Sequence, residues 1–257
     1  MISKNSKKRI KTVLMQFGLW NFVKAIKGSD KGNPLNKDFM EVGVELYKAF
    51  VKPNDLVFDV GANYGNRVAL FLSLEAKVVA IEPQQKCVAY LKNKFKNVEI
   101  EAVGLGAKRE LKTFYEADHS VLSTFSGDYI EKVKNTRHKT SIWTKKEEVQ
   151  IVTLDELILK HGQPSFIKID VEGYEYAVLE GLSQKTGTIS VEYNVPEMTD
   201  TVIKCLDKLQ NLGYNSFNYS IGESMVFKNN WMSYIEFMAI VQQDAFLQTS
   251  FGDVYAK

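Results

Sequence analysis

The chain carries the segment Val57-Phe58-Asp59-Val60-Gly61-Ala62-Asn63-Tyr64-Gly65, in which an apolar run meets a carboxylate and then a tight glycine turn. The apolar residues suit a strand that is buried on both faces of a parallel sheet. Gly61 removes the Cβ where the chain must pass a ligand, and Gly65 lets the next helix begin close to the strand. This order of residues is typical of a nucleotide-type cofactor site in an α/β protein.

A second buried strand is predicted at residues 78–81, and it ends in the acid Glu82, about one strand–helix–strand unit after Asp59. A carboxylate at this place can accept bonds from both cis hydroxyls of an adenosine ribose. The glycine spacing differs from G-x-G-x-x-G, which counts against a dinucleotide-dependent oxidoreductase. Each feature alone also has a plain structural reading, as a simple turn or as a solvated acid.

A second signature lies at residues 166–175, where the chain reads FIKIDVEGYE. It is preceded by TLDEL at residues 153–157 and followed by VLEG at residues 178–181. Together with the glycine turn and Glu82, and in this order, these motifs resemble the FkbM-type family of class I S-adenosylmethionine-dependent methyltransferases. The resemblance covers residues 51–194. It implies S-adenosylmethionine as cofactor and a small-molecule or glycan acceptor, commonly a hydroxyl of a sugar, glycolipid or secondary metabolite.

The resemblance also implies a cofactor site at the carboxyl ends of the strands. The backbone of the glycine turn would approach the methionine part of the cofactor, Glu82 would take the ribose, and Val103 would line the adenine. Asn63 would bond the cofactor carboxylate, and Asp170 would sit beneath the sulfonium. The predicted cofactor residues are Asp59, Gly61, Asn63, Gly65, Glu82, Val103 and Asp170.

Methyl transfer to a hydroxyl requires alignment and a base within hydrogen-bond reach, because a hydroxyl is a weak nucleophile. Asp170 and Glu172 are the leading candidates, since strand alternation would bring both carboxylates to one side and raise the pKa of one of them. A turn after Asp170 would break that alternation. Lys168 has the same parity and is predicted to pair with Asp170, in a catalytic or a purely structural role. His119 is the alternative base.

The acceptor is predicted to contact Glu192 and His119. Glu192 ends the next strand and could hold hydroxyls by hydrogen bonds. Asp170, Glu172 and Glu192 are also hard oxygen ligands of the kind that divalent cations prefer. The three histidines show no ligand spacing, however, so no metal is predicted.

Strands that alternate with helices after residue 51 predict an α/β fold of the class I methyltransferase (Rossmann-like) type. We expect a mostly parallel seven-stranded sheet with helices on both faces, over residues 51–257, and an N-terminal helical extension at residues 1–50. The last two predicted strands, at residues 214–218 and 225–228, should form an antiparallel edge. Residues 117–146 are polar and predict a long loop, a candidate acceptor lid.

Composition agrees with such an enzyme. A net charge of +2 argues against a strongly basic face for nucleic acid, although it leaves room for local basic patches. Two cysteines in 257 residues give no disulfide framework, which favours the cytoplasm. Residues 10–26 have an amphipathic helical pattern with lysines between the apolar positions. That helix should cover the domain or touch an anionic membrane peripherally. A cofactor-binding scaffold without catalysis is the alternative to an enzyme.

Overall fold

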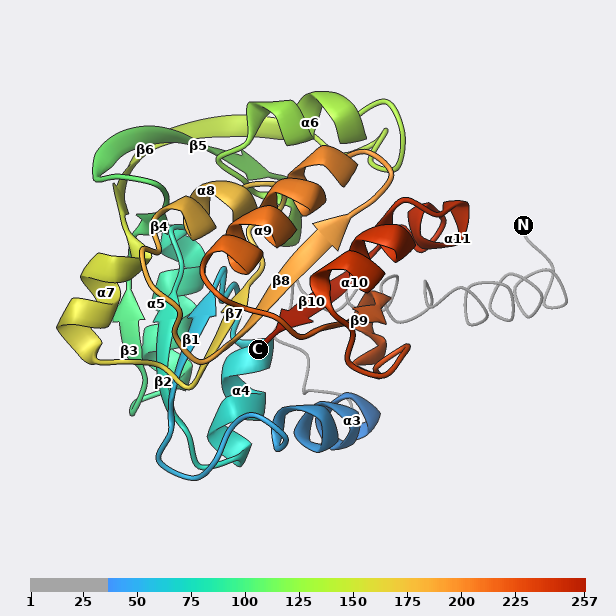
Figure 1. Ribbon diagram of the computed structural model, residues 1–257. Helices are drawn as coiled ribbons and strands as arrows, with labels where there is room; N and C mark the ends of the chain where they lie inside the picture. Colours follow the sequence, from blue (N-terminus) through green and yellow to red (C-terminus); the bar gives the residue numbers. More distant parts are fainter. Residues whose placement is uncertain (1–36) are drawn as a thin grey trace, which may run out of the picture.

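The computed structural model describes residues 37–257, which form an α/β fold around a seven-stranded sheet (Figure 1). The sheet has the order β3-β2-β1-β7-β8-β10-β9. The first five of these strands are parallel, and β10 runs antiparallel to both of its neighbours. The strands are β1 (Leu56–Val60), β2 (Lys77–Ile81), β3 (Glu99–Glu101), β7 (Phe166–Ile169), β8 (Thr188–Asn194), β9 (Phe217–Ile221) and β10 (Phe251–Ala256). The predicted mostly parallel seven-stranded sheet is confirmed.

Helices cover both faces of this sheet because its strands are apolar on both sides. Along β1, Val57 belongs to a core beneath α3, α4 and α5, whereas Phe58 and Val60 belong to a core beneath α7 to α11. The helices are α3 (Lys37–Tyr47), α4 (Asn66–Ser73), α5 (Gln85–Lys94), α7 (Leu154–His161), α8 (Glu175–Glu180), α9 (Thr199–Asn211), α10 (Tyr234–Val241) and α11 (Asp244–Leu247). Asp59 has the parity of Val57 and therefore faces α3 and α4.

The TLDEL motif has a structural role at the start of α7. Thr153 Oγ1 accepts the backbone amide of Glu156 at 3.1 Å, and the Glu156 carboxylate accepts the amide of Thr153 at 2.8 Å. This reciprocal capping box satisfies two amide donors that the helix itself leaves unpaired.

The predicted long loop at residues 117–146 is wrong. The segment contains η1 (Ser120–Leu122), the helix α6 (Gly127–Val133) and the start of β6 (Trp143–Val152). β6 pairs with β5 (Glu110–Ala117) and β4 (Gly104–Leu105) in a separate three-stranded sheet. Figure 1 shows β5, β6 and α6 beyond the arrowhead of β8, over the carboxyl-end edge of the main sheet. α6 is too short for a clear helical period, although Ser126 caps it by accepting the amide of Tyr129.

The predicted antiparallel edge is also wrong in its strands. Residues 225–228 form no strand, and the antiparallel strand is β10, which lies between β8 and the edge strand β9. Gly252 and Asp253 interrupt the apolar pattern of β10 and hide it from periodicity. Gly252 is required there, since a Cβ would lie 2.1 Å from the carbonyl oxygen of Ser220.

Within the predicted helical extension at residues 1–50, the structure describes α3, which packs through Leu46 and Tyr47 against the core beneath α4. The predicted amphipathic helix at residues 10–26, with its proposed membrane contact, lies outside the described residues. Within residues 37–257, none of the helices has the length and apolar character needed to cross a membrane.

Candidate active site

A pocket of about 900 Å³, counted with its open mouth, lies at the carboxyl ends of the parallel strands. The strand order reverses direction between β1 and β7, and ligands of open α/β sheets bind at such a switch point. Seven of the sequence-predicted residues line the pocket: Gly61, Asn63, Glu82, Val103, Asp170, Glu172 and Glu192. The two sequence motifs therefore converge on one site.

Gly61 is where the two motifs touch. Its φ of +85° lies in the left-handed region, and a Cβ there would stand 1.8 Å from the carbonyl oxygen of Asp170. The amide of Asp170 in turn donates to the carbonyl of Val60 at 3.0 Å. The glycine thus lets the end of β1 pass directly against the end of β7, and this contact forms the floor of the pocket.

Substituting Gly61 by alanine is expected to abolish cofactor binding, because the added methyl group forces β1 and β7 apart at the pocket floor. Gly213→Ala is the matched control, since Gly213 has a similar φ of +93° and nothing within 4 Å of its Cβ position. Calorimetric titration with S-adenosylhomocysteine measures the difference. Equal binding by both variants would show that the close contact is dispensable.

Glu82 presents a buried carboxylate to the pocket, with only 2% of its surface exposed. One oxygen accepts the amide of Asn63 at 2.7 Å and the other accepts the amide of Gln84 at 2.8 Å. Burial raises the pKa of Glu82 to about 7. Each carboxylate oxygen retains a lone pair, so the oriented group can still accept two hydroxyl donors, as a ribose diol requires.

Polar side chains that the sequence did not single out tie the segment after β5 to this region. Ser120 Oγ donates to Asn63 Oδ1 at 3.2 Å, and Gln84 Nε2 donates to the carbonyl of Ser120 at 3.0 Å. Ser123 Oγ donates to Gln84 Oε1 at 3.2 Å. Gln84, Ser120 and Ser123 line the pocket, so the candidate lid contributes a wall of it.

An acidic cluster lines the same pocket as the glycine turn. Asp170, Glu172 and Glu192 each offer a carboxylate oxygen, and these oxygens lie within 4.8 Å of one another. Strand alternation does not bring them together, because β7 ends at Ile169 and Glu172 has a φ of +55°. A turn does so instead, and the Glu175 carboxylate closes that turn by accepting the amides of Val171 and Gly173 at 3.1 and 3.0 Å.

The surroundings of the cluster favour the protonated forms of Glu172 and Glu192. Burial, followed by the charge of Asp170, raises the pKa of Glu172 to about 8, and the same causes raise the pKa of Glu192. Tyr129 Oη donates to Glu172 Oε2 at 2.6 Å, which leaves the other oxygen for the pocket. Tyr129 comes from α6 and lies in no motif, and its bond to Glu172 was not predicted. The three carboxylates could serve a polar acceptor or a hard cation.

Lys168 lies below this cluster and does not line the pocket. Its Nζ is 3.1 Å from Asp170 Oδ2, which confirms the predicted ion pair, and 2.7 Å from Asp253 Oδ1. Burial lowers the pKa of Lys168, but Asp170 and Asp253 outweigh it and hold this pKa well above the ordinary range. Lys168 therefore stays charged and orients Asp170.

Three other predicted residues stand outside the pocket lining. Asp59 is the register partner of Lys168 on the α4 side of the sheet, and burial raises its pKa to about 7. Gly65 makes room for α5, because a Cβ there would lie 2.5 Å from the ring of Phe95. His119 precedes η1 and does not line the pocket either.

Known proteins and protein-family models resemble this chain to different degrees. Among solved structures, a precorrin-6y C5,15-methyltransferase from Geobacter metallireducens is 12% identical with a TM-score of 0.44, covering 88% of this chain and 91% of that one. A putative O-methyltransferase from Klebsiella pneumoniae is 8% identical with a TM-score of 0.44, covering 91% and 87%. No curated protein sequence matches. The model of the methyltransferase FkbM domain matches residues 59–216, more than half of the chain. The chain belongs to the FkbM methyltransferase family, and its cofactor is S-adenosylmethionine.

Proposed function

We propose that this methyltransferase acts on a hydroxyl of an uncharged polar acceptor, such as a sugar, glycolipid or hydroxylated secondary metabolite. The observation that carries the proposal is the acidic cluster that shares one pocket with the glycine turn. Within residues 37–257, five carboxylate side chains line this pocket and no Lys, Arg or His does: Glu82, Asp170, Glu172, Glu192 and Glu223. Such a lining repels phosphate and carboxylate groups on an acceptor. It accepts hydrogen bonds from hydroxyls.

In this proposal the residues of the pocket have separate roles. S-adenosylmethionine supplies an electrophilic methyl group when bound. Glu192 would accept a hydrogen bond from the acceptor, and the free oxygen of Glu172 would take the hydroxyl proton as the methyl group leaves the cofactor sulfur for the acceptor oxygen. Tyr129 and the Glu175 turn hold Glu172 in place. Both cysteines are unpaired, which supports placing the enzyme in the reducing cytoplasm.

A survey of matched acceptors tests the proposal. The purified chain is incubated with methyl-labelled S-adenosylmethionine and sets of sugars that differ only in a neutral, amino or phosphate substituent, with and without a chelator. We expect label on neutral acceptors, none on their phosphorylated counterparts, and no loss of transfer after chelation. Preference for phosphorylated acceptors would overturn the substrate class. A folded protein that binds cofactor and methylates nothing would favour the scaffold alternative.

Glu172→Gln should lower kcat by roughly 10²- to 10⁴-fold, the usual contribution of a general base. In the unsubstituted protein, turnover should rise with pH toward about 8, because the raised pKa keeps Glu172 protonated at lower pH. The variant should lose this pH dependence. Glu180→Gln, an exposed acid at the end of α8, is the control. An unchanged pH profile in Glu172→Gln would remove Glu172 as the base.

A further inference from the structure

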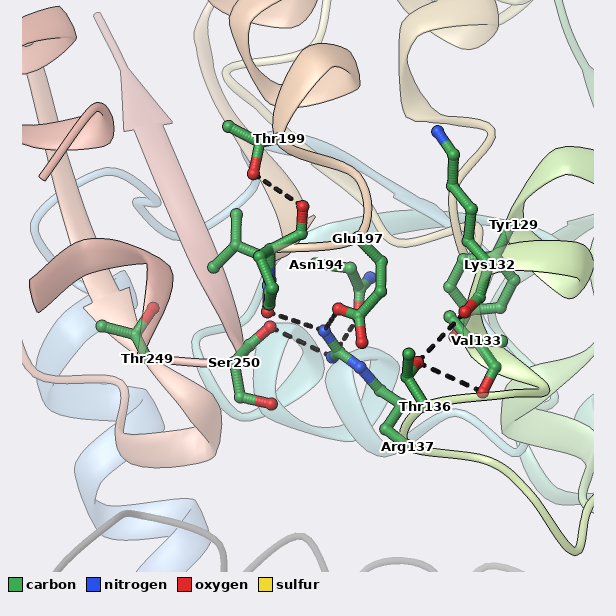
Figure 2. A network of polar contacts seen from close by, with 12 residues as sticks. Tyr129, Lys132, Val133, Thr136, Arg137, Asn194, Glu197, Thr199, Thr249 and Ser250 are labelled. Carbon is green, nitrogen blue, oxygen red and sulfur yellow. Dashed lines mark hydrogen bonds and ion pairs between the residues drawn. The ribbon is translucent and has the colours of Figure 1, made fainter. Parts of the chain in front are cut away.

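The guanidinium of Arg137 joins the segment after α6 to the end of β8 (Figure 2). Nη1 donates to Asn194 Oδ1 at 3.1 Å and to the carbonyl of Ser250 at 3.0 Å. Nη2 donates to the carbonyl of Val195 at 2.7 Å and forms an ion pair with Glu197. The Arg137 side chain is 17% exposed and that of Glu197 is 10% exposed, so this is a well-shielded contact rather than a surface pair.

These bonds fix the orientation of the Asn194 amide. A guanidinium has only donors, so the atom that faces Arg137 must be the amide oxygen. The amide nitrogen then points the opposite way, and it donates to Glu192 Oε2 at 3.1 Å. Asn194 is 6% exposed, so water cannot easily replace either partner. Without Arg137, the amide oxygen would lose its donor, and the bond to Glu192 alone would orient the amide.

The same segment also holds the second acid of the cluster. Tyr129 of α6 donates to Glu172 at 2.6 Å, and Arg137 follows α6 by a few residues. One segment therefore reaches both glutamates, directly through Tyr129 and indirectly through Asn194.

We propose that Arg137 and Asn194 form a positioning relay that fixes Glu192 at the acceptor end of the pocket. Arg137 sets the amide, and the amide sets the carboxylate. The inference rests on the proposed function only for the role of Glu192 toward the acceptor. The relay itself concerns only the orientation of two side chains, Asn194 by Arg137 and Glu192 by Asn194. A purely structural network would instead serve to hold the loop after β8, and its contact to Glu192 would be incidental.

Asn194→Asp tests the link between the amide and Glu192, whereas Arg137→Lys tests whether Arg137 acts through that amide. The aspartate keeps an oxygen for Arg137, so the loop contact is retained or strengthened. It loses the donor to Glu192 and places a second carboxylate there. The charged groups that act on Glu192 are otherwise unchanged: Asp170, Glu172 and Glu175 oppose its ionisation, and Lys168 favours it.

The experiment is a carbon-13 titration of glutamate carboxyls in the full chain loaded with S-adenosylhomocysteine, with the Glu192 signal assigned by Glu192→Gln. Asn194→Asp should raise the titration midpoint of Glu192 by about one pH unit or more, because a hydrogen bond to the ionised form is lost and a like charge is added. Arg137→Lys keeps the charge but cannot serve all four acceptors, and it should shift the midpoint less in the same direction. Thr199→Ala, which removes only a bond to the Pro196 carbonyl in the same loop, should leave it unchanged.

An unchanged Glu192 midpoint in a folded Arg137→Lys protein would overturn the relay, because the charge added by Asn194→Asp acts on Glu192 whatever Arg137 does. Kinetics give a second readout: Asn194→Asp should raise the KM for acceptor about 10-fold while cofactor affinity stays unchanged, as expected when one acceptor hydrogen bond is lost. Because the titration needs no turnover, a protein that methylates nothing would count against the proposed function and not against the relay.

Discussion

Replacing Glu82 by glutamine is expected to weaken binding of S-adenosylhomocysteine by about 10- to 100-fold, the effect of losing a hydrogen bond to a charged group. The carboxylate is oriented by the amides of Asn63 and Gln84, one on each oxygen. A glutamine can satisfy only one of these donors and turns its own amide hydrogens toward the other. The ribose site then loses both its charge and its geometry. Calorimetric titration gives the affinity directly.

The control is Glu99→Gln, since Glu99 is an exposed acid at the start of the neighbouring strand β3. This variant should bind like the unsubstituted protein. The melting temperature of each variant without ligand shows whether the Glu82 substitution disturbs the fold. Unchanged affinity in a folded Glu82→Gln sample would mean that this acid is a turn-stabilising residue and that another group holds the ribose.

Local signals predicted that the glycine turn, Glu82 and the second acidic motif meet at one place, and all three line the pocket. The glycine turn, Glu82 and the second acidic motif each occupy a few consecutive residues, so their chemistry can be inferred from the sequence without knowledge of the fold. The parallel sheet then brings them together, because the carboxyl ends of parallel strands share one edge. What the sequence did not contain is the reason for Gly61, which is a contact with Asp170 more than a hundred residues away.

The acceptor side depends on contacts between distant segments. Tyr129 and Arg137 lie in no motif. Tyr129 bonds Glu172, which follows β7, and Arg137 bonds Asn194 at the end of β8. The acids converge through a left-handed turn at Glu172 that strand parity cannot foresee. β10 was not predicted for a related reason. Asp253 is a charged residue inside this buried strand, and it is tolerated because Lys168 of β7 forms an ion pair with it.

Lys168→Met should lower the free energy of unfolding by about 3–5 kcal/mol, the usual cost of removing one partner from a buried ion pair. Lys168 is 1% exposed and is the cation between Asp170 and Asp253. The buried Asp59 also lies beside it and already has its pKa raised to about 7. Removing the lysine leaves these acids uncompensated, so the variant should lose stability that Asp253→Asn restores in part.

The loss of stability in Lys168→Met should depend on pH. Lys168 lowers the pKa of Asp59, so its removal raises that pKa further above the unfolded value. A carboxyl whose folded pKa is raised favours the native state at low pH and loses that contribution as the pH rises through the folded pKa. Urea unfolding of Lys168→Met should therefore give a larger deficit at pH 8 than at pH 5.5. Lys160→Met, which removes an exposed lysine paired with Glu101, should cost at most about 1 kcal/mol. If the two variants lose the same stability, Lys168 does not balance the buried acids, and its ion pair is not what makes Asp253 tolerable inside the sheet.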